Sequence, residues 1–409
     1  MRLLFVCPYT PTQIRTRSYN LLRALAARGN QLTLATVWET EAEREALASL
    51  ERAGLPIITA RLKRTRIARN LVAALAKTQP LQARYCWQPE LGSQIAASLA
   101  QSPVDVVHIE HLRGAIYGLR LRAEQAGRSR PTPVVWDSVD CISLLFTQAA
   151  RSSRSLFGRW VSRFELHRTR RYEGYVAARF DKTLAASRND LTALEQLARE
   201  FDQGLPIGGG EVLPNGVDLD YFQPNYGARQ TSTIVLSGKM SYHANVTAAL
   251  HLVHDIMPMV WSEMPEAEVV IAGSTPPAAV RALTAAGRVR VTGFVPDLRP
   301  FLQQATIAAA PIAYGAGIQN KVLEAMASAT PTVASPQAVS ALAVRPGADV
   351  LVADDPRSFA QAILRLLQAP ALGRQLGAAG REYVTQHHHW PTIASRLEAI
   401  YRELIHPPS

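Results

Sequence analysis

Short apolar runs alternate with amphipathic segments along this chain, and this alternation limits the fold more than any other feature. Between the expected strands lie segments of helical periodicity, such as Leu21, Leu22 and Leu25 ahead of Gly29. Strands that alternate with helices form βαβ units, so we expect a mostly parallel sheet covered by helices. The strands expected in the first half are 2–7, 31–37, 55–60, 104–109, 133–137, 181–186 and 211–213.

The same pattern then occurs a second time. The stretch 204–226 between the two halves is dense in Gly and Pro and has no helical period, which is typical of a linker. We therefore predict an α/β protein of two doubly wound, Rossmann-like domains, over 1–205 and 206–389, facing each other across a cleft. A crossover helix in 390–409 should pack back on the first domain. The strands expected in the second half are 232–238, 267–272, 289–292, 306–310, 331–334 and 349–352.

Positive charge is concentrated in the first half of the chain. The 409 residues carry a net charge of +11, and residues 1–200 hold 30 Lys/Arg against 17 Asp/Glu, whereas residues 201–409 hold 14 against 16. Such an excess indicates an anionic partner, such as a membrane surface or a phosphorylated acceptor. A solvated face in an arginine-rich composition is the alternative. Nucleic acid is not expected, because aromatic residues do not interleave with the arginines.

The cysteines and the apolar runs bear on the cellular location. Cys7, Cys86 and Cys141 have no metal-ligand spacing, which indicates a reducing cytosol without a disulfide framework. No stretch approaches the roughly 18 apolar residues of a spanning helix. We expect a cytoplasmic protein, either soluble or peripheral on the inner face of the cell membrane.

The segment from Gly315 to Ala327, GAGIQNKVLEAMA, combines a glycine turn with the start of a helix. Gly315 and Gly317 allow the backbone to approach a ligand closely, and a helix that starts at Gly317 would present free N–H groups to a phosphate. Lys321 and Glu324 are three residues apart, so they share one helical face. That face offers a cation for a diphosphate and a carboxylate for sugar hydroxyls. An ordinary loop-to-helix start with a Lys–Glu ion pair is the alternative.

Five phrases of the second half stand in one order. Together they resemble the C-terminal nucleotide-sugar domain of the retaining GT-B glycosyltransferases of family 4, over about residues 180–400. The first half resembles the acceptor-binding domain of that family mainly in architecture. The phrases are LPNGVD at 213–218, SGKMSYHAN at 237–245, VTGFVPDL at 291–298, the glycine segment and PTVAS at 331–335.

The resemblance implies a role for each matching residue. Glu324 would hold the ribose hydroxyls of the nucleotide, while Lys239 and Lys321 would neutralise the leaving diphosphate. Val295, with Phe294 before it, would flank the nucleobase. The other expected donor-binding residues are Gly238, Gly317, Ile318, Gln319 and Val322.

Three positions depart from the family pattern. An earlier carboxylate that the family often carries is replaced by Ala316, and a second lysine is replaced in the region of Asn245. The first turn, 8–15, lacks the paired glycines common there, so Arg15 or Arg17 would have to replace donor contacts from that loop.

On the acceptor side, the strand at 104–109 ends in His108-Ile109-Glu110-His111. Doubly wound folds carry their ligands at such strand ends, and the resemblance implies a histidine there, close to the sugar or the acceptor. Glu110 or His111 could orient an acceptor hydroxyl. A histidine bonded only to backbone is the alternative for this position. The expected catalytic set is therefore Glu110, His111, Lys239 and Lys321.

Other ionisable clusters receive structural interpretations. The adjacent carboxylates of Asp354 and Asp355 diverge, and this pair is interpreted as a helix N-cap. At least one of Asp137 and Asp140 is also expected to cap a helix. The consecutive side chains of His387–His389 cannot easily converge on one ion. We find no Asp-x-Asp able to hold Mg²⁺ beside a diphosphate, and we expect neither a metal nor a cofactor.

Two basic amphipathic segments, 61–77 and 151–171, stand out in the first half. In the second, the apolar residues Leu156, Phe157, Trp160, Val161 and Phe164 lie on one stripe flanked by arginines. This is the composition of an interfacial helix on anionic lipid. Helices packed on the sheet with their arginines in solvent are the alternative.

The sequence thus predicts a retaining hexosyltransferase that uses a UDP- or GDP-linked sugar and needs no metal. Its acceptor would be a glycan or a glycolipid, and an anionic membrane surface is a further expected partner. Two alternatives stay open at this point. One is a GT-B sugar-nucleotide epimerase, and the other is a non-catalytic GT-B protein that binds a membrane surface.

Overall fold

The computed structural model describes residues 1–12, 16–152, 156–201, 209–225, 227, 229–315 and 317–406, without the side chains of 148–163. The chain forms two compact units: Met1–Pro214 with Ile393–Ser409, and Asn215–Thr392. The sequence-based boundaries were placed at 205/206 and 389/390. Arg15, Ala316 and the apolar stripe between Leu156 and Val161 lie outside the described residues or side chains.

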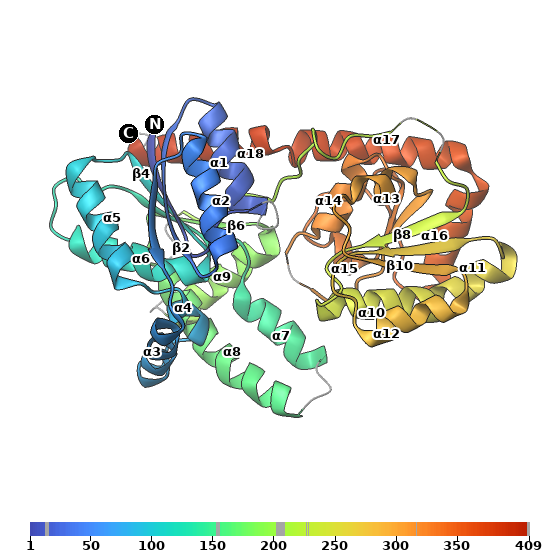
Figure 1. Ribbon diagram of the computed structural model, residues 1–409, viewed down its shortest axis with the longest axis horizontal. Coiled ribbons are helices and arrows are strands. Elements are labelled where there is room, and N and C mark those ends of the chain that lie inside the picture. The colour runs from blue at the N-terminus through green and yellow to red at the C-terminus, as the bar shows by residue number, and fades with distance from the viewer. Residues whose placement is uncertain are drawn as a thin grey trace. The chain divides into compact units, whose positions relative to one another are not determined.

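Unit 1 is built on a seven-stranded sheet in which every pair of neighbours is parallel (Figure 1). The inner strand RLLFVC is buried from Leu3 to Cys7, as expected for a parallel strand with helices over both faces. The strands, in sheet order, are β3 (Ile57–Arg61), β2 (Gln31–Trp38), β1 (Arg2–Cys7), β4 (Val106–Glu110), β5 (Val134–Asp137), β6 (Lys182–Ala185) and β7 (Glu211–Val212).

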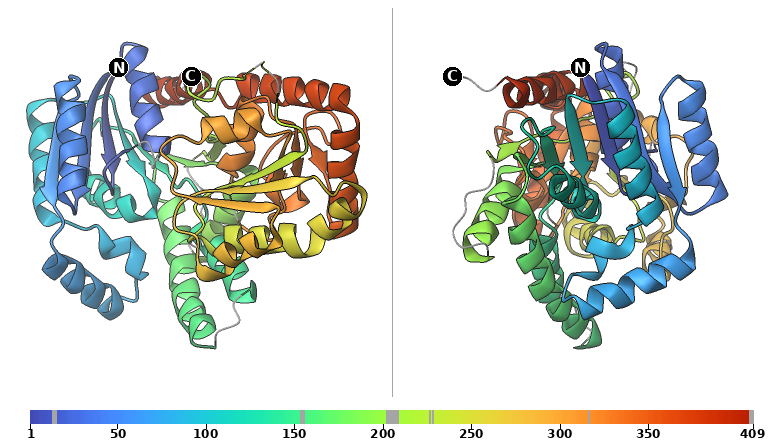
Figure 2. Two further views of the ribbon diagram at one scale, coloured as in Figure 1. Left: turned by 45° about the vertical axis from the view of Figure 1, so that its right-hand side comes forward. Right: turned by 90° about the vertical axis from the view of Figure 1, so that its left-hand side faces the viewer.

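Helices lie against both faces of this sheet (Figure 2). The last helix of the chain, α18, returns to unit 1, where the Tyr401 hydroxyl lies 2.8 Å from His108 Nδ1. The helices of unit 1 are α1 (Thr16–Ala27), α2 (Glu41–Arg52), α3 (Arg64–Ala76), α4 (Leu81–Tyr85), α5 (Pro89–Gln101), α6 (His111–Glu124), α7 (Ile142–Ser152), α8 (Leu156–Ala177), α9 (Arg188–Phe201) and α18 (Trp390–Ile405).

Unit 2 contains a second parallel sheet, of six strands. Each expected strand of both units is observed within two residues of its expected ends. The doubly wound architecture predicted from the alternation is therefore confirmed. The strands, in sheet order, are β10 (Val289–Gly293), β9 (Glu268–Ala272), β8 (Thr233–Ser237), β11 (Ile307–Ala310), β12 (Thr332–Ala334) and β13 (Leu351–Val352).

Two arginines hold the C-terminal end of α14, the helix that follows β11. Arg229 donates to the carbonyls of Ser328 and Ala329, and Arg381 donates to the carbonyl of Ala327. They satisfy carbonyls that a helix end leaves without partners. The helical segments of unit 2 are α10 (His243–His251), a π-helical turn (Leu252–Ile256), α11 (Met257–Glu263), α12 (Ala278–Arg281), a 3₁₀ turn (Ala282–Ala286), α13 (Arg299–Gln304), α14 (Asn320–Ala327), α15 (Pro336–Val339), α16 (Pro356–Gln368) and α17 (Pro370–His387).

Each sheet has one point at which the strand order reverses direction. In unit 1 this point lies between β1 and β4, and in unit 2 it lies between β8 and β11. Open parallel sheets bind their ligands outside the carboxyl ends of the strands at such points. The loops that follow these four strands are therefore the first places to look for a site.

Candidate functional site

In unit 2, the loop after β8 is held by the loop after β9. A Cβ at Gly273 would overlap the carbonyl oxygen of Gly238, and the Met240 amide donates to the Ser274 carbonyl at 2.9 Å. Gly238 itself has φ +142°, and a Cβ there would lie 2.8 Å from Asn245 Nδ2. Both positions therefore require glycine, because of backbone conformation and of space.

Asn245 connects the loop after β8 with helix α14. Its buried carboxamide donates to the Lys239 carbonyl at 2.9 Å and accepts from Lys321 Nζ at 2.7 Å. Lys321 Nζ also lies 3.4 Å from Gln319 Oε1. The structure thus brings Gly238, Lys239, Gln319 and Lys321 together at the switch point of unit 2. The sequence singled out Asn245 only as a departure from the family pattern, although a polar residue at a buried helical position is a usable signal.

The charges of Lys321 and Glu324 are both disfavoured by their surroundings. Burial lowers the pKa of Lys321 to about 8, and the nearby Glu324 charge opposes this shift. Burial likewise raises the pKa of Glu324 to about 7, against the effect of Lys321. Within the described residues the two groups form no ion pair, so the ion-pair alternative is wrong. Two ionisable groups with shifted pKa values at a switch point indicate a binding site.

The glycine segment forms a loop before α14 begins. Gly315 and Gly317 have φ of 152° and 72°, and Gln337 Nε2 donates to the Gly315 carbonyl at 2.6 Å. The helix begins at Asn320 rather than at Gly317, so the amides of Gly317 and Ile318 belong to the loop. The side chains of Ile318 and Val322 are buried in the apolar core, which leaves only their backbone groups for a ligand.

The other expected donor-binding side chains are accessible. Lys239 is exposed, Val295 is half-buried, and Phe294 has 77% of its surface exposed. Phe294 and Val295 follow β10, which is separated from β8 by β9. Beside the switch point, the Tyr314 hydroxyl lies 3.0 Å from both His243 Nδ1 and Thr247 Oγ1, which ties the glycine loop to α10.

At the switch point of unit 1, Glu110 is buried and already bonded. Its carboxylate accepts from the Tyr9 hydroxyl at 2.5 Å and from Cys7 Sγ at 3.3 Å. Burial and the charge of Glu110 raise the pKa of both Tyr9 and Cys7. Glu110 is therefore placed as a structural residue that connects β4 with β1 and the loop after it, and not as a group that contacts an acceptor.

His111 is better placed to meet a ligand. It opens α6 with φ +64°, is partly exposed, and its Nδ1 accepts from the Arg113 amide at 3.2 Å. Burial and the Arg113 charge lower the pKa of His111 to about 3, so the imidazole is neutral at physiological pH. Because Nδ1 accepts a hydrogen bond, the ring proton resides on Nε2. His111 therefore offers its Nε2–H group as a donor to a ligand. Its Nδ1 is bonded to the backbone, as the alternative interpretation of this histidine expected.

A buried network beneath these residues was not anticipated. Arg17 donates to both carboxylate oxygens of Asp137, at 2.9 and 3.0 Å, and to the Leu213 carbonyl. Arg17 thus forms a buried ion pair with Asp137, and its guanidinium does not extend toward a ligand. Burial raises the pKa of Asp137, but the charges of Arg17 and His108 outweigh burial, so it is lowered overall.

Neither Asp137 nor Asp140 caps α7. The carboxylate of Glu173 accepts from the amides of Ile142 and Ser143 at 2.6 and 3.0 Å, which corrects the expected cap. Burial and the nearby Asp190 charge raise the pKa of Asp140 to about 7. The N-cap expected from the pair Asp354-Asp355 is confirmed, and Asp355 supplies it by accepting from the amides of Arg357 and Ser358.

His388, the middle residue of His387–His389, is a structural residue. Its Nδ1 lies 2.7 Å from the Asn215 carbonyl oxygen and its Nε2 lies 3.2 Å from the Tyr383 hydroxyl. Both ring nitrogens are therefore occupied. In the part of the chain that the structure describes, no three His, Cys, Asp or Glu side chains gather as a metal site would require.

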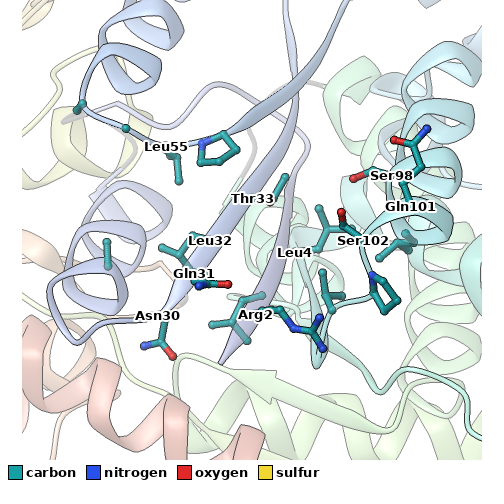
Figure 3. A pocket seen from close by; sticks show the side chains of 18 residues that line it. Arg2, Leu4, Asn30, Gln31, Leu32, Thr33, Leu55, Ser98, Gln101 and Ser102 are labelled. Atoms are coloured by element: carbon teal, nitrogen blue, oxygen red, sulfur yellow. The ribbon is translucent and has the colours of Figure 1, made fainter.

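Unit 1 also contains a pocket of about 700 Å³ (Figure 3). It is lined by Arg2, Asn30, Gln31 and Ser102 among others, at the amino ends of β1 and β2. This is the opposite edge of the sheet from the carboxyl ends that carry Tyr9, Glu110 and His111. The pocket therefore does not belong to the candidate site.

Comparison with known proteins agrees with this geometry. Residues 231–369 match the family profile described as glycosyl transferases group 1. A stretch of 203 residues is 27% identical to MMP alpha-(1->4)-mannosyltransferase of Mycolicibacterium hassiacum, covering 47% of this chain and 48% of the relative. The matched part thus spans about half the length of that curated relative.

Solved structures are similar over nearly the whole chain. Sucrose-phosphate synthase from Thermosynechococcus elongatus has a TM-score of 0.67 at 19% identity, covering 99% of both chains. HepE from Anabaena, solved in complex with UDP, has a TM-score of 0.67 at 14% identity, covering 98% of this chain and 99% of its own.

The two parallel-sheet units thus have the GT-B fold of these solved structures. Within the second unit, residues 231–369 are similar to the glycosyl transferases of group 1. No helix of the described residues has both the length and the apolar character to cross a bilayer.

Proposed function

We propose that this protein transfers a hexose from a nucleoside-diphosphate sugar to an acceptor hydroxyl, with retention of the anomeric configuration. One observation carries the proposal. At the switch point of unit 2, Lys321 and the Gly238–Lys239 turn are tied together through Asn245. A diphosphate needs cations and backbone amides on one side, and this cluster supplies both.

Departure of the nucleoside diphosphate places negative charge on its phosphate oxygens. Lys239 and Lys321 would stabilise that charge, since preorganised charges make the largest contribution when they face the group where charge develops. The backbone amides of Gly317 and Ile318 would add hydrogen bonds to the phosphate or the sugar. Two ammonium groups can meet this demand without a metal, and no cofactor is assigned a role.

Glu324 and the residues after β10 would recognise the nucleoside. The Glu324 carboxylate would accept hydrogen bonds from the ribose hydroxyls, and Phe294 and Val295 would flank the base. HepE, which has a similar fold, was solved with UDP and with UDP-glucose. We therefore assign a UDP- or GDP-linked sugar as the donor.

On the acceptor side, the geometry favours His111 over Glu110. Glu110 is buried and bonded to Tyr9, whereas His111 is partly exposed with a donor at Nε2. A neutral imidazole N–H would orient a sugar or acceptor oxygen rather than remove a proton. The acceptor would be a glycan or a glycolipid.

The test is binding and turnover with a panel of UDP-, GDP- and ADP-linked sugars. One of them should raise the melting temperature, and Glu324→Gln should reduce that shift. Glu263→Gln is the matched control, because Glu263 is an exposed carboxylate of the same unit, at the end of α11. A panel without any shift, or an equal loss in both variants, would contradict the proposal.

The same assay distinguishes the other activities. Proton NMR of the product gives its anomeric configuration, and an inverted product would refute retention. Conversion of the donor to a 2-epimer without acceptor would indicate an epimerase instead. Nucleotide binding without transfer or hydrolysis would indicate a non-catalytic protein.

A further inference from the structure

The region from the end of α2 to the start of α5 carries only positive charge. Residues 53–89 contain seven Lys/Arg and no Asp/Glu. They include α3, which follows the carboxyl end of β3 and projects beyond the sheet of unit 1 (Figures 1 and 2). Such a run without acids is unlike a mixed, solvated surface, in which both signs are interspersed.

Four of these cations line a hollow of about 330 Å³ at the start of α3. They are Arg61, Lys63, Arg66 and Arg69, and Glu90 is the acidic residue of the lining. Arg61 lies over the ring of Trp38 at 5.1 Å. Among the described residues, none of the four has a carboxylate within ion-pairing distance. The hollow therefore holds several positive charges that form no ion pair with the described part of the chain.

The outer face of α3 adds apolar side chains to this charge. Val72 and Leu75 have 67% and 47% of their surface exposed, and with Arg64 and Ala68 they form one stripe at helical spacing. The opposite face is fixed, because Asn70 Nδ2 donates to the Trp87 carbonyl at 2.7 Å. Exposed branched aliphatic residues on a well-anchored helix indicate a surface that something covers.

Helix α8 extends this surface. Arg168 donates to the carbonyl of Leu75 at 3.2 Å, and its guanidinium lies 4.3 Å from the ring centre of Phe164, which is itself exposed. Arg168 thus lies between the apolar residues of α3 and an aromatic ring of α8. Together, Val72, Leu75 and Phe164 form an apolar patch, and the cations of α3 border it.

We propose that this face of unit 1 docks on the surface of an anionic phospholipid bilayer. Lipid phosphates would occupy the hollow among Arg61, Lys63, Arg66 and Arg69, while Val72, Leu75 and Phe164 enter the boundary between headgroups and acyl chains. Charge complementarity selects this partner over a neutral protein surface. The inference goes beyond the proposed transfer reaction and does not depend on it.

The experiment measures binding of the full chain to phosphatidylcholine vesicles with and without phosphatidylglycerol. Binding is expected only to the anionic vesicles, and it should weaken as salt is raised. Arg64→Gln/Arg66→Gln/Arg69→Gln should lower affinity about a hundredfold, since each cation near an anionic surface contributes about fivefold. The matched control, Arg357→Gln/Arg365→Gln/Arg374→Gln, removes three exposed charges from unit 2 and should bind like the native protein.

A second variant tests the apolar part without changing charge. Val72→Ser/Leu75→Ser should bind anionic vesicles at least about tenfold more weakly, with an unchanged melting temperature because both side chains are exposed. Equal losses in the α3 variant and the unit 2 control would overturn the proposal. So would binding to neutral vesicles alone, or a response to inorganic phosphate or RNA without any binding to vesicles.

Discussion

The titration of Lys321 and Glu324 predicts how donor affinity depends on pH. The proposed binding form has Glu324 ionised and Lys321 protonated. Below pH 7 the carboxylate gains a proton and no longer accepts from ribose hydroxyls, and above pH 8 the lysine loses the charge that faces the diphosphate. Affinity should therefore pass through a maximum near pH 7.5.

The size of this change in affinity follows from the pKa values of about 7 for Glu324 and about 8 for Lys321. The binding form is roughly 60% populated at pH 7.5, about 3% at pH 5.5 and about 25% at pH 8.5. Apparent affinity falls in proportion to the competent fraction. We expect the dissociation constant to rise about twentyfold at pH 5.5 and about two- to threefold at pH 8.5.

Isothermal titration with an intact sugar nucleotide measures this profile, because its phosphate diester groups do not titrate in this range. Glu324→Gln should remove the acid limb, at the expense of affinity. Lys321→Arg should remove the alkaline limb, since a guanidinium remains protonated. A flat native profile, or limbs that persist in these variants, would refute the assignment.

Two further predictions concern the stability of unit 1. Tyr401→Phe should lower the free energy of unfolding by about 1–3 kcal/mol, because the buried His108 loses its hydrogen-bond partner; thermal melts should show this, whereas Tyr175→Phe at an exposed site should change little. Arg17→Ala should cost about 3–5 kcal/mol by leaving Asp137 buried without its ion pair, and chemical denaturation should show that Arg17→Ala/Asp137→Asn recovers part of it. An equal loss in the double variant would contradict this account.

The fold could be predicted closely because its signals are local. Each parallel strand is a continuous apolar run, and each crossover helix follows within a few residues, so periodicity and order alone define the βαβ units. The capping motif at Asp355 is equally local and was identified correctly. The start of α14 was placed too early, because glycines that open a turn do not indicate how many loop residues follow.

Part of the candidate site could also be predicted, because the glycine segment and Lys321 lie within one short motif. Asn245 could not be assigned its role, since its partner Lys321 is 76 residues away in sequence. Glu110 was expected to contact an acceptor, but its carboxylate accepts hydrogen bonds from Cys7 of the neighbouring strand and from Tyr9 of the loop after that strand. At least one of the two aspartates before α7 was expected to cap a helix, but Glu173 from α8 accepts from the first amides of α7 instead.

By itself, the sequence determined the two parallel sheets, their order of elements and the glycine loop beside a lysine and a glutamate. Those features depend on residues that are only a few positions apart, so their spacing can be read directly from the sequence. Only the tertiary structure decided which charges are paired. Arg17 forms an ion pair with Asp137, whereas the cations of α3 have no carboxylate partner among the residues that the structure describes. Pairing and burial depend on which distant segments meet, and they control the charge of each group.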